Sequence, residues 1–234
     1  MNTEIPLSGA QWAANSETYA ALISEHLSPK SLWLDAGCGW RLLEDDMEPL
    51  EDWLVTRCRA ILGMDPALTN HRNIRLLVRG SLNALPFADD SFDLITCNMV
   101  AEHLDDPSKA FGEAARCLRP LGAFIVKTPN LLNYGVMGNA VASRTMPEKW
   151  RLRLVYGSDD RAPEDFFRVR YKANTMRRLK RLLQESGLQV HKTIALPQRR
   201  PFFRKTEKLE RFLMKLTPTS SLLVCAHKPS VVKP

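Results

Sequence analysis

Residues 31–40 read Ser-Leu-Trp-Leu-Asp-Ala-Gly-Cys-Gly-Trp, an apolar run that leads into an acid and two glycines. Residues 32–34 predict a buried strand, because a short apolar run bounded by turn residues is typical of a strand covered on both faces. Gly37 and Gly39 predict a turn in which the backbone takes unusual dihedral angles or lets a ligand come close. A strand that ends in such a loop is how a doubly wound α/β sheet builds a nucleotide site.

The remainder of the chain alternates strand-like and helix-like segments. Further strands are predicted at residues 58–65, 74–79, 92–97, 123–127, 188–194 and 221–226. Helical spacing of apolar residues predicts helices over 12–27, over 43–54 with a break at Pro49, from Pro107 behind the cap Asp106, from the cap Asn174 or Thr175 to Gly187, and over the basic segment 209–216. Strands that alternate with helices predict a parallel α/β sheet.

Residues 129–173 do not fit this alternation. They read as irregular and rich in Asn, Pro, Tyr and Arg, and they are too long for an ordinary connection. We expect them to form an insertion that covers the substrate. The chain is then one domain over residues 1–234, in which 1–29 hold an N-terminal helix, 30–128 the cofactor-binding core, 129–173 the insertion, and 174–234 the C-terminal part of the sheet with the basic amphipathic helix.

Composition limits the classes of protein to consider. The 234 residues are 44% apolar, enough for a sizeable core, and no apolar stretch approaches the ~20 residues that span a bilayer. The N-terminus carries acids and no basic, cleavable leader, which predicts a cytoplasmic protein. Five scattered cysteines, an odd number without a Cys-x-x-Cys pair, argue against a disulfide framework or a zinc site, so no metal is expected. Cys38 has no evident base beside it, so a catalytic thiol is not expected.

The net charge of +7 divides unevenly along the chain. Residues 1–117 hold 9 Lys and Arg against 18 Asp and Glu, a balance of −9, and residues 118–234 hold 24 against 8, a balance of +16. Such asymmetry indicates either an anionic partner for the C-terminal half or attraction between the two halves. The possible anionic partners are an anionic acceptor, RNA and a membrane surface.

Five segments, in order, resemble the class I S-adenosylmethionine-dependent methyltransferases, specifically their type 11-like small-molecule group. Residues 31–40 resemble motif I, hydrophobic-hydrophobic-Asp/Glu-x-Gly-x-Gly. The other four segments are Gly63-Met64-Asp65-Pro66, like the acidic post-I motif; Ser91 to Ile95, like the run that opens strand four; Glu102 to Pro107, like Glu-His-x-x-Asp-Pro; and Leu118 to Gly122, like the Leu-Arg-Pro-Gly-Gly turn.

The resemblance implies a fold, an activity and a cofactor. The implied fold is a Rossmann-like, doubly wound, seven-stranded and mostly parallel sheet in three α/β/α layers, with an antiparallel last strand. The implied activity is methyl transfer from S-adenosyl-L-methionine to a small-molecule or lipid-like acceptor. We considered two alternatives, an RNA-binding or RNA-modifying methyltransferase and a cofactor-binding homologue without catalysis. We also considered peripheral membrane association through the basic helix at 209–216.

The expected cofactor site lies at the carboxyl ends of the strands. Gly37 and Gly39 let backbone amides approach the methionine end of the cofactor. Asp65 can accept hydrogen bonds from both ribose hydroxyls, and Met64 and Leu82 can supply apolar faces for adenine. The full set of expected cofactor-binding residues is Asp35, Gly37, Cys38, Gly39, Met64, Asp65, Ser81, Leu82, Asn98 and Met99.

Three positions depart from the family pattern. Ser81 stands where many members have an acid, and its hydroxyl is a weaker acceptor for the adenine amino group than a carboxylate. The third glycine of the fuller motif I is missing near Trp40, which also disfavours a nicotinamide-dependent oxidoreductase. Leu121 replaces one glycine of the turn before strand five.

Methyl transfer from a sulfonium is an in-line displacement that needs positioning more than covalent help. His103 is the candidate general base for a hydroxyl or protonated amine acceptor, because histidine ordinarily titrates near neutrality. Asn130, Tyr134 and Tyr171 are the candidate acceptor-binding residues.

Overall fold

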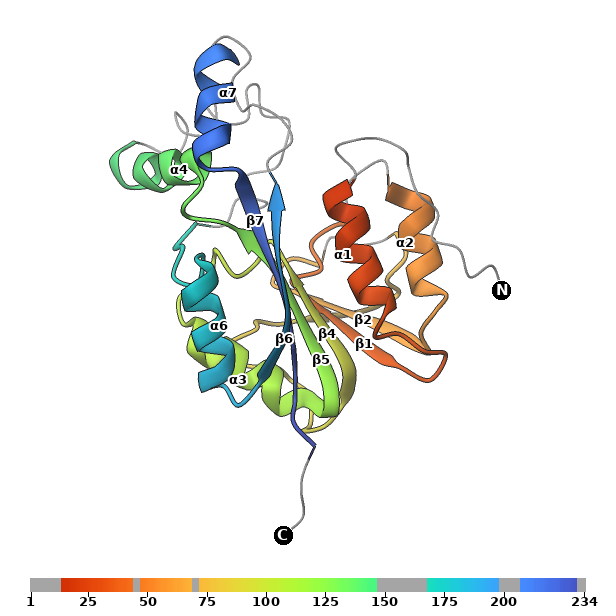
Figure 1. Ribbon diagram of the computed structural model, residues 1–234. Coiled ribbons are helices and arrows are strands. Elements are labelled where there is room, and N and C mark those ends of the chain that lie inside the picture. The colour runs from red at the N-terminus through yellow and green to blue at the C-terminus, as the bar shows by residue number, and fades with distance from the viewer. Residues whose placement is uncertain (1–13, 44–46, 69–71, 147–167, 198–206, 231–234) are drawn as a thin grey trace.

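Seven strands form a single sheet in the order β3-β2-β1-β4-β5-β7-β6 (Figure 1). The structure, a computed structural model, describes residues 14–43, 47–68, 72–146, 168–197 and 207–230. The strands are β1 (Leu32–Ala36), β2 (Ala60–Asp65), β3 (Leu76–Arg79), β4 (Phe92–Asn98), β5 (Leu118–Pro129), β6 (Gln189–Pro197) and β7 (Thr219–His227). The helices are α1 (Ala14–Ser24), α2 (Glu48–Val55), α3 (Pro107–Cys117), α4 (Tyr134–Thr145), α6 (Met176–Glu185) and α7 (Glu207–Leu216).

The strand directions confirm the expected sheet. β1 pairs in parallel with β2 and β4, and β4 pairs in parallel with β5. β7 is inserted antiparallel between β5 and β6. The sheet is therefore mostly parallel with an antiparallel last strand, the arrangement that the resemblance implies.

Helices cover both faces of the sheet, so the molecule has the three α/β/α layers expected. In Figure 1, α1 and α2 lie on one face, and α3 and α6 lie on the other. Adjacent strand residues face opposite layers: Trp33 packs with Tyr19 and Ile23 of α1, whereas Leu34 belongs to the core cluster that includes Phe111 of α3. This continuous burial explains why residues 32–34 are uniformly apolar.

Helix caps lie where the sequence predicts them. The Asp106 carboxylate accepts the N–H of Lys109 at 3.0 Å, and Pro107 occupies the first turn of α3. The Thr175 hydroxyl accepts the N–H of Arg178, which identifies Thr175 as the cap of α6. Gly187 follows that helix with φ of +82°, a conformation that glycine adopts at little cost.

Two helical predictions were wrong. Pro49 does not break a helix over 43–54; it lies in the first turn of α2, where its missing N–H costs nothing, and residues 41–43 before it are not helical. Residues 129–173 are not irregular throughout, because residues 134–145 form α4, whose start is capped by the Asn133 side chain. Residues 12–13 of the predicted first helix lie outside the described part.

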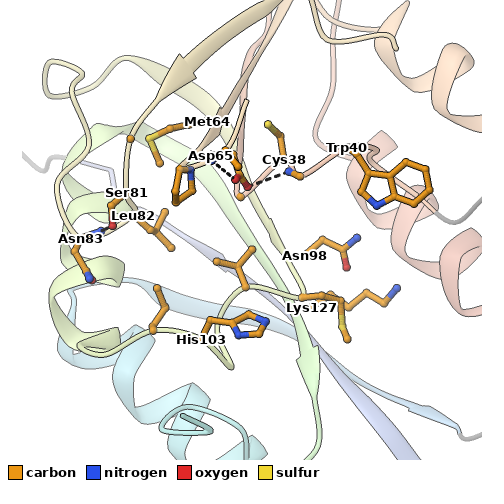
Figure 2. A pocket seen from close by; sticks show the side chains of 18 of the residues that line it. Cys38, Trp40, Met64, Asp65, Ser81, Leu82, Asn83, Asn98, His103 and Lys127 are labelled. Carbon is orange, nitrogen blue, oxygen red and sulfur yellow. Dashed lines mark hydrogen bonds between the residues drawn. The ribbon is translucent and has the colours of Figure 1, made fainter. Parts of the chain in front are cut away.

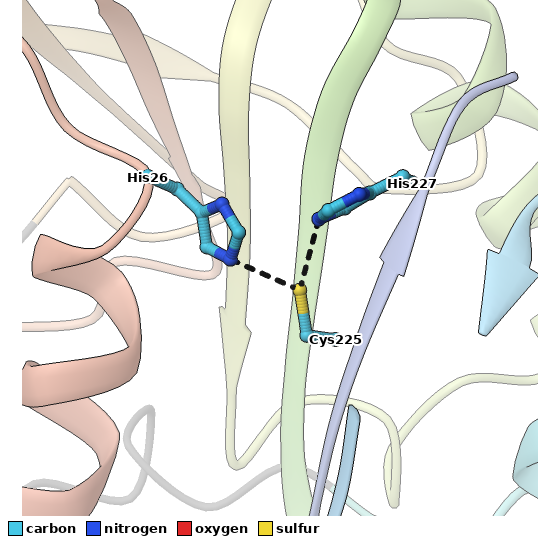
Figure 3. A group of neighbouring side chains, drawn as sticks. All are labelled: His26, Cys225 and His227. Atoms are coloured by element: carbon cyan, nitrogen blue, oxygen red, sulfur yellow. Dashed lines mark hydrogen bonds between the residues drawn. The ribbon is translucent and has the colours of Figure 1, made fainter. Parts of the chain in front are cut away.

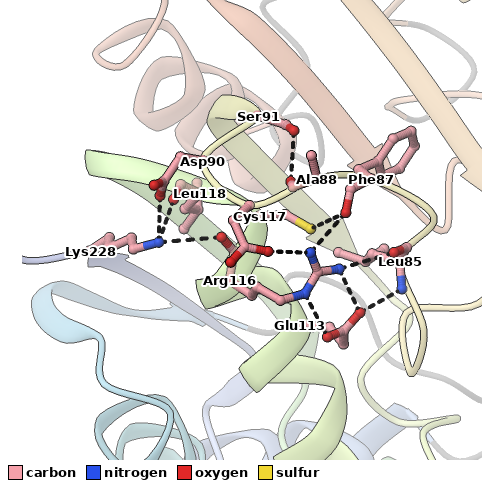
Figure 4. Close-up of polar contacts among 11 residues, drawn as sticks. Leu85, Phe87, Ala88, Asp90, Ser91, Glu113, Arg116, Cys117, Leu118 and Lys228 are labelled. Atoms are coloured by element: carbon pink, nitrogen blue, oxygen red, sulfur yellow. Dashed lines mark hydrogen bonds and ion pairs between the residues drawn. The ribbon is translucent and has the colours of Figure 1, made fainter.

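A dense polar network anchors the loop before β4 to α3 (Figure 4). The Arg116 guanidinium donates to both Glu113 oxygens at 2.9 Å, to Asp89 at 2.7 Å, and to the Phe87 and Leu85 carbonyls at 2.8 and 3.0 Å. Five donors in a rigid fork suit this set of acceptors. The network fixes the loop that leads into the amino end of β4.

The first part of β5 contains a strained residue, because β5 begins at Leu118 and not at residue 123 as predicted, and so includes the segment expected to be a turn. Leu121 has φ of +67°, a backbone conformation that is sterically unfavourable for a residue with a Cβ. Its side chain is 71% exposed, so burial of the leucine does not offset this cost. This is the position at which the family pattern has glycine. Within the described residues, no helix combines the length and apolarity needed to cross a bilayer.

Candidate cofactor site

A cavity of about 530 Å³ opens at the carboxyl ends of β1, β2 and β4 (Figure 2). Its volume lies in the usual range for small-molecule and cofactor sites, roughly 300–1,000 Å³. All expected cofactor residues except Asp35 line it, namely Gly37, Cys38, Gly39, Met64, Asp65, Ser81, Leu82, Asn98 and Met99. The structure thus brings together residues from four separate segments of the chain.

The loop after β1 bends over the end of β2. The N–H groups of Gly37 and Cys38 both donate to the Met64 carbonyl, at 2.6 and 3.2 Å. Gly37 has φ of +84°, and a Cβ there would lie 2.2 Å from Val100, so only glycine fits. Gly39 has φ of +47° and no atom within 4 Å of the place of a Cβ, which leaves its backbone open to a ligand.

Asp65 ends β2 and is almost completely buried beside this loop. One carboxylate oxygen accepts the N–H of Gly39 at 3.0 Å, and the other accepts the N–H of Ala67 at 2.9 Å. A carboxylate oxygen has two lone pairs, so each retains one for a further donor. Asp65 therefore fixes the loop and still presents two acceptors to the cavity.

Asp35 does not line the cavity, although we expected it to bind cofactor. It lies within the sheet, where its Oδ1 accepts the Thr96 hydroxyl at 2.6 Å and Thr96 in turn accepts the Trp33 ring N–H at 2.8 Å. Burial, with the nearby charges of Asp65 and Glu51 adding to it, raises the Asp35 pKa to about 7. The Asp35 carboxyl therefore connects β1 to β4 inside the sheet.

Two buried amide oxygens on the cavity wall lack a hydrogen-bond partner among the described residues. They are Oδ1 of Asn98 and Oδ1 of Asn83. Buried acceptors are normally satisfied, so these two oxygens are candidates for a hydrogen bond from a ligand or from a bridging water. Together with the open Gly39 backbone and the two acceptors of Asp65, they suit a ligand that carries several N–H and O–H donors, as S-adenosylmethionine does.

His103 lies on the cavity wall at the side opposite Asp65 (Figure 2). Its Nδ1 is 3.3 Å from the Arg168 carbonyl, and its Nε2 is 3.9 Å from a Glu102 oxygen. Burial raises the Glu102 pKa to about 7, and this carboxyl accepts the Thr128 hydroxyl at 3.0 Å. Donation of Nδ1–H to the Arg168 carbonyl would select the tautomer in which Nε2 is the basic nitrogen.

The three expected acceptor-binding residues lie outside the cavity lining. The Asn130 side chain bonds the Thr219 carbonyl and the Leu132 N–H, at 3.2 Å each. Tyr134 begins α4. The Tyr171 hydroxyl accepts from Asn139 at 2.8 Å, which connects residue 171 to α4. These contacts hold the segments around the cavity in place.

Sequence reasoning missed two cationic residues of the lining. Lys127 is buried, with 6% of its surface exposed. Its ammonium lies 5.4 Å from the centre of the Tyr19 ring. Arg41 stacks on Trp40 at 3.6 Å. The sequence does contain an indication of Lys127, because it is the one charged residue in the otherwise apolar segment 123–127 and lies where the predicted strand ends.

The strand order, the antiparallel β7 and a glycine-loop cavity at the strand ends define the class I methyltransferase fold. Residues 34–126 match the family model described as a methyltransferase domain. Among solved structures, the YcgJ protein of Bacillus subtilis superposes with a TM-score of 0.57 at 18% identity, covering 92% of this chain and 99% of that one. The resemblance to the class I S-adenosylmethionine-dependent methyltransferases is thereby confirmed.

Curated relatives match over shorter segments. A demethylmenaquinone methyltransferase of Corynebacterium efficiens is 30% identical over 129 residues, which are 54% of this chain and 55% of the relative. A malonyl-[acyl-carrier protein] O-methyltransferase of Hahella chejuensis is 41% identical over 63 residues, 26% of this chain and 23% of the relative. The chain thus spans about half, or less, of the length of these relatives.

Proposed function

We propose that this protein transfers a methyl group from S-adenosylmethionine to a small or lipid-like acceptor. The observation that carries the proposal is the cavity in which the glycine loop, Asp65 and the unfilled Asn98 acceptor converge. The methyltransferase-domain match over residues 34–126 supports the same cofactor.

The residues present suit the proposed cofactor. Gly37 and Gly39 would hold its methionine end, Asp65 its ribose hydroxyls, and Met64 with Leu82 its adenine. We assign Ser81 and Asn83, which both line the cavity, as acceptors for the adenine amino group, and the Asn83 oxygen lacks a hydrogen-bond partner among the described residues. The cofactor supplies an activated methyl group on a sulfonium, so the protein need only exclude water and align the acceptor.

The other side of the cavity would hold the acceptor. His103 accepts the acceptor's proton when the acceptor is a hydroxyl or a protonated amine, because the Arg168 carbonyl holds Nδ1–H and leaves Nε2 basic. Lys127 would orient an acceptor that carries negative charge. The relatives named for menaquinone and malonyl-carrier substrates make such acceptors reasonable first choices for assay.

Calorimetry with two glycine variants tests the cofactor proposal. We expect the intact chain to bind S-adenosylhomocysteine and not NAD. Gly37→Ala should weaken binding about tenfold, because a Cβ at a positive φ costs about 1–2 kcal/mol and would meet Val100 at 2.2 Å. Gly112→Ala is the control, since it lies in α3 with no atom within 4 Å of its added Cβ. Binding of NAD alone, or equal affinity of both variants, would contradict the proposal.

We further propose that the acceptor is met at an anionic membrane surface. α4 and α7 lie beyond the carboxyl end of β5, the same end as the cavity (Figure 1), and hydrogen bonds of 3.0 and 3.2 Å tie Asn133 and Tyr134 to Thr217. These two helices and their flanks carry an apolar rim of exposed side chains, which are Leu132, Met137, Val141, Met146, Leu209, Phe212 and Leu216. Exposed basic residues Lys208, Arg211 and Lys215 accompany the rim on α7. Apolar and basic side chains on one helix are typical of interfacial membrane binding.

Flotation with vesicles tests membrane contact. The intact chain should float with vesicles rich in anionic lipid and float less with neutral ones. Phe212→Asp, in the rim, should reduce flotation, whereas Leu121→Asp, at the opposite end of the sheet, should not. Equal flotation of both variants would remove the proposal. Retention on RNA without flotation would favour the RNA alternative instead.

A further inference from the structure

Three of the five histidines of the chain gather at one place, far from the cofactor cavity. His26 follows α1, His191 lies on β6 and His227 ends β7. His227 pairs with Ala123, near the amino end of the parallel strands, whereas the cavity lies at their carboxyl ends. The cluster is therefore separate from the proposed methyl-transfer site.

A cysteine lies at the centre of this cluster (Figure 3). The Cys225 sulfur is 3.3 Å from Nε2 of His26 and 3.6 Å from Nε2 of His227. The three ligand atoms all lie within 4.8 Å of one another. A tetrahedral zinc ion with bonds of about 2.3 Å to sulfur and about 2.0 Å to nitrogen places such atoms about 3.5 Å apart. The observed separations fit that requirement with small adjustments.

The surroundings hold the ligand side chains in place. The β6–β7 register shifts between Val190 and Lys192, so His191 is the extra residue of a bulge. Its ring stacks on His227, with centroids 5.0 Å apart and an interplanar angle of 18°. Bulges commonly re-aim a side chain, and here the bulge gives His227 a packing partner. The ring of His26 meets His227 edge-on at 5.0 Å.

The protonation states suit metal binding at the imidazoles. Burial and the neighbouring imidazoles lower the pKa of His26 and of His227, which favours the neutral form of each ring, the form that binds a metal. Burial raises the pKa of the Cys225 thiol to about 12, so a metal must displace the thiol proton into solvent, as it does at other thiolate sites. Glu25 and Lys192 pair with each other beside the cluster at 3.0 Å.

We propose that His26, Cys225 and His227 form a zinc site, with water as the fourth ligand. Mixed imidazole and thiolate ligands are those that zinc prefers, and two half-buried histidines leave access for water. The ion would connect the end of α1 to the last strand. The sequence indicated no such site because 199 positions separate His26 from Cys225.

Metal titration of the full chain, purified without a histidine tag and stripped with chelator, tests the proposal. We expect one equivalent of Zn²⁺ to bind and to raise the melting temperature. Cys225→Ser and His26→Gln should each weaken binding at least about tenfold, since even changes to residues beyond the ligands cost 10–100-fold. Cys58→Ser is the matched control and should bind as the unaltered chain does, because Cys58 lies outside the cluster. Equal zinc affinity of Cys225→Ser and the unaltered chain overturns the site.

A second measurement covers the case in which a variant does not fold. Co²⁺ in place of Zn²⁺ should give a thiolate-to-cobalt charge-transfer band and the strong visible bands of a tetrahedral ion in the unaltered chain and in Cys58→Ser. Absence of the thiolate band from the unaltered chain overturns the proposal without any variant. S-adenosylhomocysteine affinity should not change in Cys225→Ser, so failure of the zinc site and failure of the cofactor site are distinguishable.

Discussion

Two aspartates near the ends of adjacent strands, Asp35 and Asp65, have different roles because their hydrogen-bond partners differ. Asp35 lies in β1 opposite Gly63 of β2, and Asp65 ends β2 two residues further along. Asp35 has a hydroxyl partner inside the sheet, whereas Asp65 accepts two backbone N–H groups at the cavity. Both are acidic and nearly buried, yet only Asp65 can touch a ligand in the cavity.

Asp65→Asn should weaken S-adenosylhomocysteine binding by at least about 1.5 kcal/mol, roughly tenfold. An amide offers one acceptor oxygen instead of two, so either a loop N–H or a ribose hydroxyl loses its acceptor. Isothermal titration measures the change. Asp52→Asn, an exposed carboxylate of α2, is the control that should bind normally. Unchanged affinity in Asp65→Asn would mean that the ribose binds elsewhere.

Asp35 should make the protein less stable as pH rises. Its folded pKa of about 7 lies above the ordinary 3.8, so between those values the folded state holds a proton that the unfolded chain has lost. The free energy of unfolding therefore falls as pH rises from about 4 to about 7, by up to ~1.4 kcal/mol per pH unit. Glu102, whose pKa is also raised to about 7, adds a similar contribution.

Urea unfolding at pH 5 and pH 7 measures this dependence. Asp35→Asn should reduce the slope and leave the part that Glu102 contributes, because the amide oxygen can still accept the Thr96 hydroxyl. A slope identical to that of the unaltered chain would show that Asp35 is ionised in the folded state.

At the scale of elements, the start of β5 contains a strained residue at a position where the family pattern has glycine. Leu121 occupies the left-handed region, and its N–H still bonds the Lys228 carbonyl at 2.9 Å, so this segment forms despite its side chain. The β5–β7 pairing around it over-determines this conformation. Strain of this kind persists only where the neighbouring structure enforces it.

Leu121→Gly should raise the free energy of unfolding by about 1 kcal/mol, because glycine adopts a positive φ without the steric cost of a Cβ. Denaturant unfolding at a fixed pH measures the gain. Leu121→Ala removes the same exposed apolar surface but keeps the Cβ, so it should give no such gain. Equal stabilisation by both variants would attribute the effect to the exposed leucine and not to the backbone.

At the scale of the whole molecule, the acidic and basic halves attract each other. Among the described residues four ion pairs join them, and these are Arg119 to Asp93 at 2.6 Å, Arg170 to Asp105 at 2.8 Å, Lys192 to Glu25 at 3.0 Å and Lys228 to Asp90 at 2.7 Å. Each such surface pair contributes little by itself. They nevertheless place carboxylates beside basic side chains, which lowers the positive electrostatic potential that would attract a polyanion such as RNA.

We therefore expect little RNA binding. Filter retention of total RNA should be weak and should change little between two salt concentrations. The reason is that basic side chains paired with acidic ones do not neutralise phosphates and so do not release counterions from the RNA. Arg177→Ala, an exposed cation of α6, should leave retention unchanged. Strong retention that falls steeply with salt would instead favour the RNA alternative.

The sequence alone was sufficient for the fold and for most of the residues that line the cavity. Glycine positions, strand-end acids and apolar runs are local features, and their spacing predicts which loops reach the carboxyl edge of the sheet. That is why Gly37, Asp65 and Asn98 were assigned to the cavity that they line. The helix caps at Asp106 and Thr175 are local in the same sense.

Only the tertiary structure decided which side chains face one another. Asp35 is excluded from the cavity because it lies inside β1, before the glycine loop, where its carboxyl accepts the Thr96 hydroxyl of β4, and Lys127 is included because β5 ends beside β4. The gathering of His26, Cys225 and His227 depends on α1 packing against β7. Sequence spacing determines the elements, whereas contacts between residues 199 positions apart arise only once the sheet has formed.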